Sequence, residues 1–306
     1  MNSSKNDLRK LQVTGGSTVI VSLPKEWIKA NNLGKGDFVN LEELASGDLR
    51  LSSIQSKASK KVATIDCCEH MTGLRDLMIG AYLSGADVIK ISCKNKIPRG
   101  TRSDVREFLR DTRGMEIEVD DDKEIRIISI LNPSELRLQV SINRMYILIS
   151  SLVNDAMDIL LGEPIDLLSD IDDRERQIDA RRLLLERQVA ASIQLPSVER
   201  KLAVDRFTAM EHANIARILE RMGDHATRLA YLIKDNSQVI KIKPTEMPLS
   251  AIPMWAKQLK TIVHNMYTKD VNIIHNAKSE LVELRNKIEG EEDEFCLLYT
   301  SDAADD

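Results

Sequence analysis

Two pairs of acidic residues have the spacing most relevant to chemistry in this sequence. Glu175 and Asp179 form one ExxxD pair, and Glu220 and Asp224 form another. In a helix, residues four apart lie on the same face, with Cβ atoms about 6 Å from each other. If the two segments are neighbouring helices, four carboxylates point into one volume. The spacing therefore predicts a shared anionic site.

Such a site has two interpretations. Four carboxylates in a confined volume remain ionised together only when cations neutralise them, and their hard oxygen atoms favour Mg, Mn, Ca or Fe and also accept Zn. Alternatively, the pairs are solvated helix faces, because ExxxD arises by chance in acidic helices and arginines stand nearby. Neither segment carries the ExxH pair of di-iron bundle enzymes, which argues against oxidase chemistry.

Two features of the sequence favour the metal interpretation. The first segment has an apolar seam at helical steps, formed by Ile171, Ile178, Leu185 and Val189. Glu175 lies on this seam, where an acid is costly unless it has a partner. In the second segment Gly223 precedes Asp224, although glycine costs about 1 kcal/mol relative to alanine inside a helix. A small residue there lets a helix or a metal cluster approach closely.

The elements that must position these acids are long helices. From residue 132 onward apolar residues recur with a period of about 3.6, and Asn132-Pro133-Ser134-Glu135 resembles a capping box at the start of the first helix. Gly162 and Pro196 mark breaks in the pattern. We predict helices at 132–161, 164–195, 197–234 and 251–276, with a fifth from about 279. Long helices with short connections predict a bundle.

Two smaller regions precede the helices. Residues 8–53 alternate apolar and polar positions around a Gly15-Gly16 turn, and they predict a ββαββ order with the short helix after Pro24. Residues 61–131 predict a small α/β region without a catalytic signature. The predicted fold class is therefore multidomain α+β. We expect domains at 1–55, 56–131, 132–236 and 248–296.

Composition limits the class of function. The net charge of −5 argues against a protein that coats nucleic acid as a whole. Four cysteines without CxxC or zinc-site spacing predict reduced thiols, and hence a cytoplasmic protein. The sequence shows no signal peptide, and its most apolar stretch is too short for membrane insertion.

Residues 297–306 do not continue the helical pattern, and we expect them to be a non-native tail that replaces the true C-terminus.

The helical part resembles the PhoU family. Residues 219–230 (LERMGDHATRLA) are similar to the family's third-helix motif, and residues 171–180 (IDDRERQIDA) are similar to its second-helix motif. The resemblance covers 132–234 well and 251–294 weakly. It implies three-helix repeats that hold metal clusters, often of iron or zinc, with Mg or Mn as alternatives. The implied ligands are Glu175, Asp179, Glu220 and Asp224, with Glu289 and Asp293 in an incomplete second repeat.

The PhoU resemblance also implies a function. Members of the family are negative regulators of phosphate uptake that act with the phosphate ABC transporter or a sensor kinase, and they are not known as enzymes. A non-enzymatic regulator of intracellular phosphate homeostasis is therefore our first hypothesis. A metal-dependent hydrolase or oxidase is a further hypothesis and is ranked third. No nucleophile–base set and no ExxH pair supports it.

The N-terminal region resembles the swapped-hairpin SpoVT/AbrB module. The match rests on residues 9–13, the Gly15-Gly16 turn and residues 19–25. It implies a homodimer and often DNA binding, for which the candidates are Lys5, Arg9, Lys10 and Lys25. Up to residue 53 the module has only one more basic than acidic residue, and its hairpin turn is neutral, which predicts weak phosphate attraction. A DNA-binding transcriptional regulator is thus the second hypothesis, beside dimerisation alone.

Overall fold

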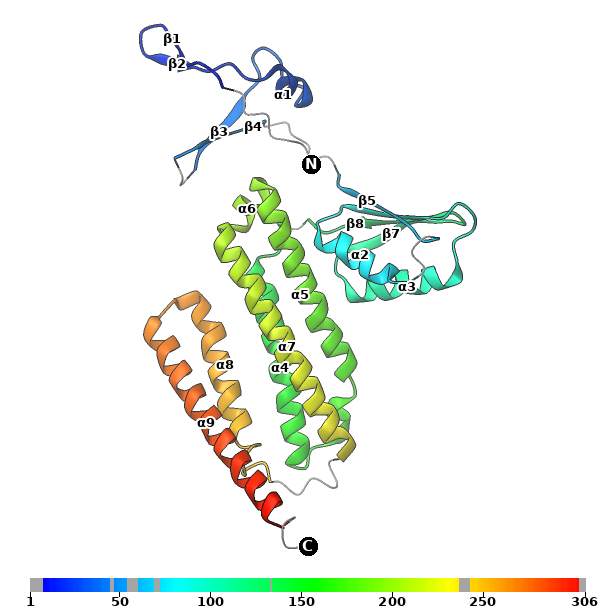
Figure 1. Ribbon diagram of the computed structural model, residues 1–306, viewed down its shortest axis with the longest axis vertical. Helices are drawn as coiled ribbons and strands as arrows, with labels where there is room; N and C mark the ends of the chain where they lie inside the picture. The colour runs from blue at the N-terminus through cyan, green and yellow to red at the C-terminus, as the bar shows by residue number, and fades with distance from the viewer. Residues whose placement is uncertain are drawn as a thin grey trace. The chain divides into compact units, whose positions relative to one another are not determined.

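The computed structural model describes residues 8–44, 47–53, 60–68, 72–132, 134–236 and 243–302 (Figure 1). The chain divides into two compact units, Met1–Ser59 and Lys60–Asp306. The first contains small hairpins, and the second contains a mixed sheet and a helical bundle. The fold class is therefore multidomain α+β, as the sequence predicts.

The N-terminal unit consists of two antiparallel hairpins with one short helix between them. Gly15 and Gly16 form the first turn with φ of 62° and 90°, a left-handed conformation that suits glycine. None of the described residues of this unit is buried, so the unit has no core of its own. The predicted order is confirmed, with β1 at Gln12–Thr14, β2 at Thr18–Ile20, α1 at Lys25–Ala30, β3 at Val39–Glu43 and β4 at Leu49–Ser53.

A four-stranded sheet with the order β5-β6-β8-β7 opens the second unit. Strands β5 and β6 are parallel and are joined by α2, whereas β8 is antiparallel to both of its neighbours. Helices α2 and α3 cover one face of the sheet (Figure 1), where Met78, Tyr82 and Phe108 are fully buried. The bounds are β5 Val62–Asp66, α2 Leu74–Leu83, β6 Val88–Ser92, α3 Arg99–Asp111, β7 Met115–Asp120 and β8 Glu124–Ser129.

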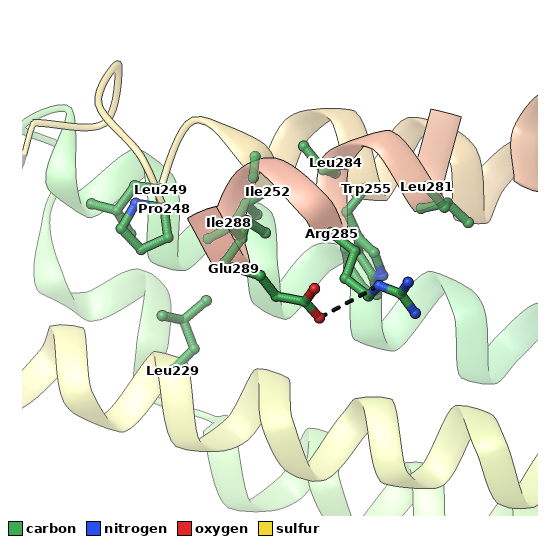
Figure 2. Close-up of a pocket in the computed structure, with 11 residues that line it drawn as sticks. Leu229, Pro248, Leu249, Ile252, Trp255, Leu281, Leu284, Arg285, Ile288 and Glu289 are labelled. Atoms are coloured by element: carbon green, nitrogen blue, oxygen red, sulfur yellow. Dashed lines mark ion pairs between the residues drawn. The ribbon is translucent and has the colours of Figure 1, made fainter. Parts of the chain in front are cut away.

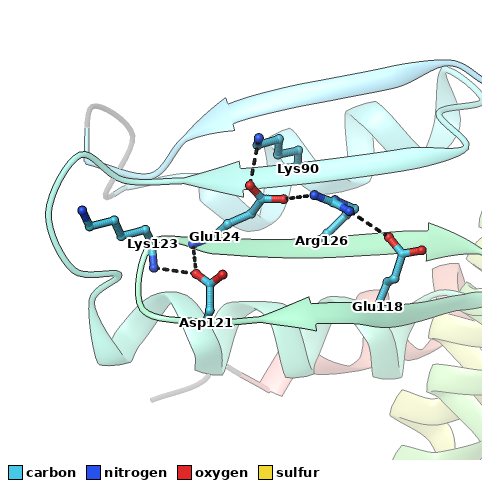
Figure 3. Close-up of polar contacts among 6 residues, drawn as sticks. All are labelled: Lys90, Glu118, Asp121, Lys123, Glu124 and Arg126. Carbon is cyan, nitrogen blue, oxygen red and sulfur yellow. Dashed lines mark hydrogen bonds and ion pairs between the residues drawn. The ribbon is translucent and has the colours of Figure 1, made fainter.

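The opposite face of this sheet carries charge (Figure 3). Strand residues alternate between faces, so Ile125 and Ile127 are buried while Glu124 and Arg126 point away from the core. Lys90 Nζ lies 2.8 Å from a Glu124 oxygen, and Arg126 pairs with both Glu124 and Glu118. Exposed pairs of this kind contribute at most about 1 kcal/mol each. These ion pairs therefore explain why charged residues alternate with buried ones along the strands, and they do not indicate a reactive site.

The remaining helices form a bundle. Helices α4, α5 and α7 pack as three long neighbours, and α8 pairs with α9 and also contacts α4 (Figure 1). Their shared core includes Ile142, Met145, Ile149, Ile178 and Leu185. No helix in the described ranges is both long and apolar enough to cross a bilayer. The bounds are α4 Leu138–Leu160, η1 Ile165–Leu168, α5 Ile171–Gln194, α6 Pro196–Leu202, α7 Arg206–Asn236, α8 Ala251–Thr268 and α9 Val271–Asp302.

Several predicted helix bounds are wrong. The predicted second helix is divided into η1 and α5, which begins at Ile171, and the predicted fifth helix begins at Val271 instead of about 279. The side chain of Asn132 accepts hydrogen bonds from the Ser134 N–H and hydroxyl in a local turn, so the expected capping box does not form and α4 begins six residues later, at Leu138. The predicted third helix is divided at Ala203, whose φ is 54°. A left-handed Lys269 ends α8 well before residue 276, and α9 continues through Asp302, past the end of the predicted helical pattern.

The cysteine prediction is also wrong. A disulfide joins Cys68 to Cys93, with their Cα atoms 5.6 Å apart, while Cys67 is a buried free thiol. The sequence offers no CxxC spacing because the two partners follow different strands, β5 and β6, which lie side by side in the sheet. Spatial neighbours across parallel strands are separated by the whole crossover helix, so spacing along the chain does not show them.

Candidate metal centre

The acids singled out by spacing lie on the two helices α5 and α7, which pack against each other in the bundle. One carboxylate oxygen each from Asp179, Glu220 and Asp224 lies within 4.8 Å of the other two. All three side chains are half-buried, so the cluster sits in the groove between the helices. The structure therefore brings three of the four predicted residues together.

Glu175 lies one turn before Asp179 on α5 and is half-buried. Its pKa is raised above the ordinary value, first by burial and then by the negative charges of Asp224 and Asp172. Repulsion from Asp224 places Glu175 electrostatically beside the three-acid cluster, although it is not one of the three mutually close residues. The neighbouring residues Ile171 and Ile178 are buried, which agrees with the predicted apolar seam.

The electrostatics of the cluster are unfavourable without a counterion. The pKa of Asp179 is raised to about 6 by burial and then by the charges of Glu220, Glu175 and Asp224, against a lowering by Arg182. A carboxylate held this close to other carboxylates is destabilised in its ionised form. A divalent cation would reverse these shifts, because its charge favours the ionised form of every ligand. The donor set therefore fits a hard or borderline divalent cation.

Most nearby arginines do not neutralise this cluster. Arg174 pairs with Asp155 and Asp170, Arg176 pairs with Asp173, and Arg217 pairs with Glu186. The exception is Arg182, whose Nε lies 3.2 Å from Glu220 Oε1 but without hydrogen-bond geometry. Sequence reasoning missed Arg182, although its position three residues after Asp179 places it beside the site. Arg176 also lowers the pKa of Glu175, but both arginines are shared with other acids, so the four carboxylates leave the site anionic.

Gly223 explains how α5 and α7 come close enough. A Cβ added at this position would meet two carbons of the Ile178 side chain at 3.1 and 3.2 Å. Distances this short require the isoleucine to move, because interiors are packed without spare space. Of the two roles left open by the sequence, the glycine thus serves the approach of a helix. Gly223 and Asp224 are adjacent because the side of α7 that packs closely on α5 is also the side from which its acids reach the site.

Replacing Gly223 by valine should destabilise the bundle by about 2 kcal/mol, because the added methyl groups overpack against Ile178. Denaturant titration of the full chain measures the loss. Gly290→Val on α9 is the matched control, since a Cβ there meets nothing within 4 Å. Equal effects of the two substitutions would mean that the contact with Ile178 is not the reason for the glycine.

The predicted second pair is not assembled in the same way. Glu289 is exposed and forms an ion pair of 3.5 Å with Arg285 (Figure 2). Asp293 lies in the part of α9 for which the structure describes the backbone and not the side chains. Glu289 borders a cavity of about 520 Å³ between α8 and α9 that is lined mainly by apolar side chains such as Trp255 and Leu284. The second-repeat metal site therefore stays a prediction.

The predicted DNA-binding residues lie in the N-terminal unit. Arg9, Lys10 and Lys25 are exposed, and Lys5 lies outside the described residues. Large apolar side chains on the same unit are also exposed, including Val13, Phe38, Leu41 and Leu49. Apolar exposure on this scale is unusual for a surface that stays in water and is typical of a protein–protein interface.

Comparison with known protein families identifies the two parts of the chain. The model of the PhoU domain matches residues 142–233, from within α4 to within α7, the segment that contains all four acids. The model described as antidote-toxin recognition MazE, bacterial antitoxin, matches residues 12–59. No curated protein and no solved structure matches the chain. The chain thus combines an N-terminal module of the MazE/AbrB type with a PhoU domain, the domain of a regulatory, non-enzymatic family of phosphate homeostasis.

Proposed function

We propose that this protein is a non-enzymatic regulator of phosphate uptake whose PhoU domain holds a metal ion between α5 and α7. The observation that carries the proposal is the convergence of Asp179, Glu220 and Asp224 within 4.8 Å, inside the segment that matches the PhoU domain. Glu175 is the fourth ligand candidate, because its pKa responds to Asp224. When bound, the ion supplies positive charge that keeps the four carboxylates ionised and the two helices together.

The regulatory role needs protein partners. Components of the phosphate ABC transporter or a sensor kinase are the partners that the PhoU domain suggests, since the family interacts with phosphate transport proteins. Iron or zinc is the proposed metal, with Mg or Mn as alternatives that the oxygen ligands also accept. In this scheme the bundle transmits phosphate status by contact, and no covalent chemistry is required of its side chains.

Phosphate uptake by cells that lack the gene tests the proposal. In phosphate-replete medium, loss of a negative regulator should raise uptake of radiolabelled phosphate, and the wild-type gene should restore low uptake. The variant with Asp179→Asn and Glu220→Gln should fail to restore it. Unchanged uptake in the deleted cells would contradict the regulatory role, whereas full rescue by the variant would contradict only the metal site.

The N-terminal unit is the proposed homodimer interface. Its described residues include no buried side chain, and Phe38 is 79 % exposed in the single chain. Two small hairpins cannot close a core alone, so a second copy is the natural cover for their apolar faces.

Deletion of residues 1–55 should therefore convert the dimer to a monomer in multi-angle light scattering. The physical reason is that apolar surface from β1 to β4 no longer buries against a partner. The far-UV circular dichroism of the shortened protein should keep its helical signal, which controls for folding of the second unit. An unchanged mass per chain would place the dimer contact elsewhere.

A DNA-binding transcriptional regulator is the second candidate, favoured by the match of residues 12–59 to an antitoxin model. Substituting Arg9→Ala and Lys10→Ala should then weaken retention on a DNA column and reduce its dependence on salt. Lys243→Ala, Lys257→Ala in the second unit is a control of equal charge change. If wild-type protein is not retained even at about 50 mM salt, where phosphate contacts are strongest, this candidate is eliminated.

A further inference from the structure

Three cysteines gather at one edge of the mixed sheet, about which the proposed function says nothing. Cys67 and Cys68 follow the last residue of β5, and Cys93 follows the last residue of β6. Their sulfur atoms all lie within 4.8 Å of one another. Cys68 and Cys93 are joined as a disulfide, and Cys67 is a free thiol that is only 1 % exposed.

The strand register places Cys67 beside Cys93, in addition to the disulfide partner Cys68. Ile65 pairs with Ile91 and Asp66 with Ser92, so the next pair across the two parallel strands is Cys67 with Cys93. The Cys67 N–H donates to the Ser92 carbonyl at 3.0 Å, which continues the ladder to this point. Adjacent strands lie about 4.8 Å apart, within the Cα separation that a disulfide spans.

Alternation of side chains puts the two sulfurs on the same face. Ile65 and Ile91 are buried, and residues two further along a strand point to the same side. Cys67 and Cys93 accordingly are both buried, at 1 % and 6 % exposure. Cys68 is exposed, and the turn after β5 brings its Cα to 5.6 Å from that of Cys93 and its sulfur into the disulfide. Cys93 therefore lies within bonding reach of one buried and one exposed cysteine.

We propose that these three residues form a thiol–disulfide exchange centre, in which Cys93 alternates between a disulfide with exposed Cys68 and a disulfide with buried Cys67. The Cys67 thiol loses its proton to water, and its sulfur attacks the Cys93 sulfur. The Cys67–Cys93 bond forms as the Cys93–Cys68 bond breaks, and Cys68 leaves as a thiolate that takes up a proton. One disulfide and one thiol exist before and after, so no oxidant or reductant is consumed.

The exchange moves the reactive thiol between two environments. With the Cys68–Cys93 bond, the only free thiol of the three is inside the core, where a small disulfide or an electrophile cannot reach it. With the Cys67–Cys93 bond, the free thiol is Cys68, on the surface. A small disulfide of the glutathione class is therefore the reagent that this centre would take. The Cys68 sulfur attacks one of its two sulfurs, the mixed disulfide forms as the bond of the small disulfide breaks, and the small thiol leaves.

A soft-metal site at the same sulfurs is the competing interpretation, because three thiolates could hold zinc or copper(I). It needs all three cysteines as thiolates, whereas two of them are bonded to each other. An unbonded third sulfur beside a disulfide is the arrangement that exchange requires, since the attacking atom must approach one of the two bonded sulfurs.

Alkylation of the native protein without reductant tests the exchange. Full-length protein with Cys296→Ser, which removes the fourth cysteine, is incubated with N-ethylmaleimide, denatured, treated with iodoacetamide and digested with trypsin. Cys67 and Cys68 share the peptide 62–75, and Cys93 lies in 91–94. We expect maleimide on Cys68 and a disulfide between Cys67 and Cys93, with fragmentation between residues 67 and 68 assigning each modification.

Two variants decide the outcome. In Cys67→Ser no thiol can attack, so Cys68 should stay bonded to Cys93 and its labelling should fall to background. In Cys68→Ser the disulfide should form between Cys67 and Cys93 instead. Cys67→Ala and a thermal melt of each variant check that labelling does not reflect unfolding. Equal Cys68 labelling with and without Cys67, maleimide confined to Cys67, no label on the wild type, or three free thiols in it would each overturn the proposal.

Discussion

Replacing Asp179 by Asn and Glu220 by Gln is expected to abolish metal binding and remove the rise in Tm that metal causes. These residues come from different helices and contribute two of the three oxygen atoms that lie within 4.8 Å of one another. A cation present at a hundred times its Kd stabilises the folded state by about 2.7 kcal/mol, and all of this should be lost. Elemental analysis of protein purified without chelator, and calorimetry with added Fe, Zn or Mn, measure the two effects.

A matched variant separates ligand loss from charge loss. Asp173→Asn with Glu211→Gln also removes one carboxylate from α5 and one from α7, but at exposed positions. This control should keep full metal stoichiometry, with a change in stability of no more than about 0.5 kcal/mol. If the Asp179 and Glu220 variant also retains the metal, the acids are a solvated face, and the PhoU domain binds no cation there.

The pH dependence of the metal-free protein offers an independent readout. The pKa of Asp179 in the folded state is about 6, above that of an ordinary aspartate, so the folded form holds its proton more tightly than the unfolded form. This stability is present at low pH and is lost as pH rises through about 6. The melting temperature of chelated protein should therefore fall between about pH 4 and 6, and the Asp179→Asn variant should show a smaller fall, to which Glu175 still contributes.

Truncating Arg187 to alanine is expected to destabilise the second unit by about 3 kcal/mol. Arg187 lies on α5, is 2 % exposed, and donates hydrogen bonds of 2.6 and 2.8 Å to the carbonyl oxygens of Tyr82 and Ala86. Its guanidinium also lies over the Tyr82 ring, 4.8 Å from the centroid. Truncation removes both hydrogen bonds and opens a cavity, and both effects act in the same direction. The Tyr82 carbonyl keeps the Gly85 N–H as a donor at 3.0 Å, so the larger hydrogen-bond loss falls on the Ala86 carbonyl.

Chemical denaturation followed by circular dichroism measures this loss. Arg187→Met separates its causes, because methionine fills much of the space but donates no hydrogen bond. Arg228→Ala, on the exposed face of α7, is the control and should change stability by no more than about 0.5 kcal/mol. A cost for Arg187→Ala as small as that of the control would show that the arginine is not what fastens α5 to α2.

Local patterns along the chain predicted most of the elements and the centre of the candidate site. The ββαββ order of the N-terminal unit was predicted, because alternation and flanking turn residues are local signals. The four acids were found because ExxxD spacing places two side chains on one helix face, and a bundle brings faces together. The start of α4 was missed because an asparagine can either cap a helix or form a local turn. Only the structure shows that the Asn132 side chain forms the turn.

Features that depend on which surfaces meet were not predictable in this way. The helical periodicity of α5 does not show which of its charged residues is buried. Arg187 is buried because α2 packs against α5 at this position. The cysteine cluster arises from a parallel pairing of β5 with β6, which the spacing of cysteines does not contain. Arg182 was overlooked for the same reason, since its partner Glu220 lies on another helix.

Helix α5 belongs to two hydrophobic cores at once. Leu183 packs with the residues that line the sheet, while Ile178, Leu185 and Val189 pack in the bundle. A helix with both attachments cannot leave one core and keep its place in the other, so the sheet region and the bundle should unfold as a single cooperative unit. Amide protons in the middle of α5 should accordingly exchange with solvent only through global opening, more slowly than those near the ends of α9.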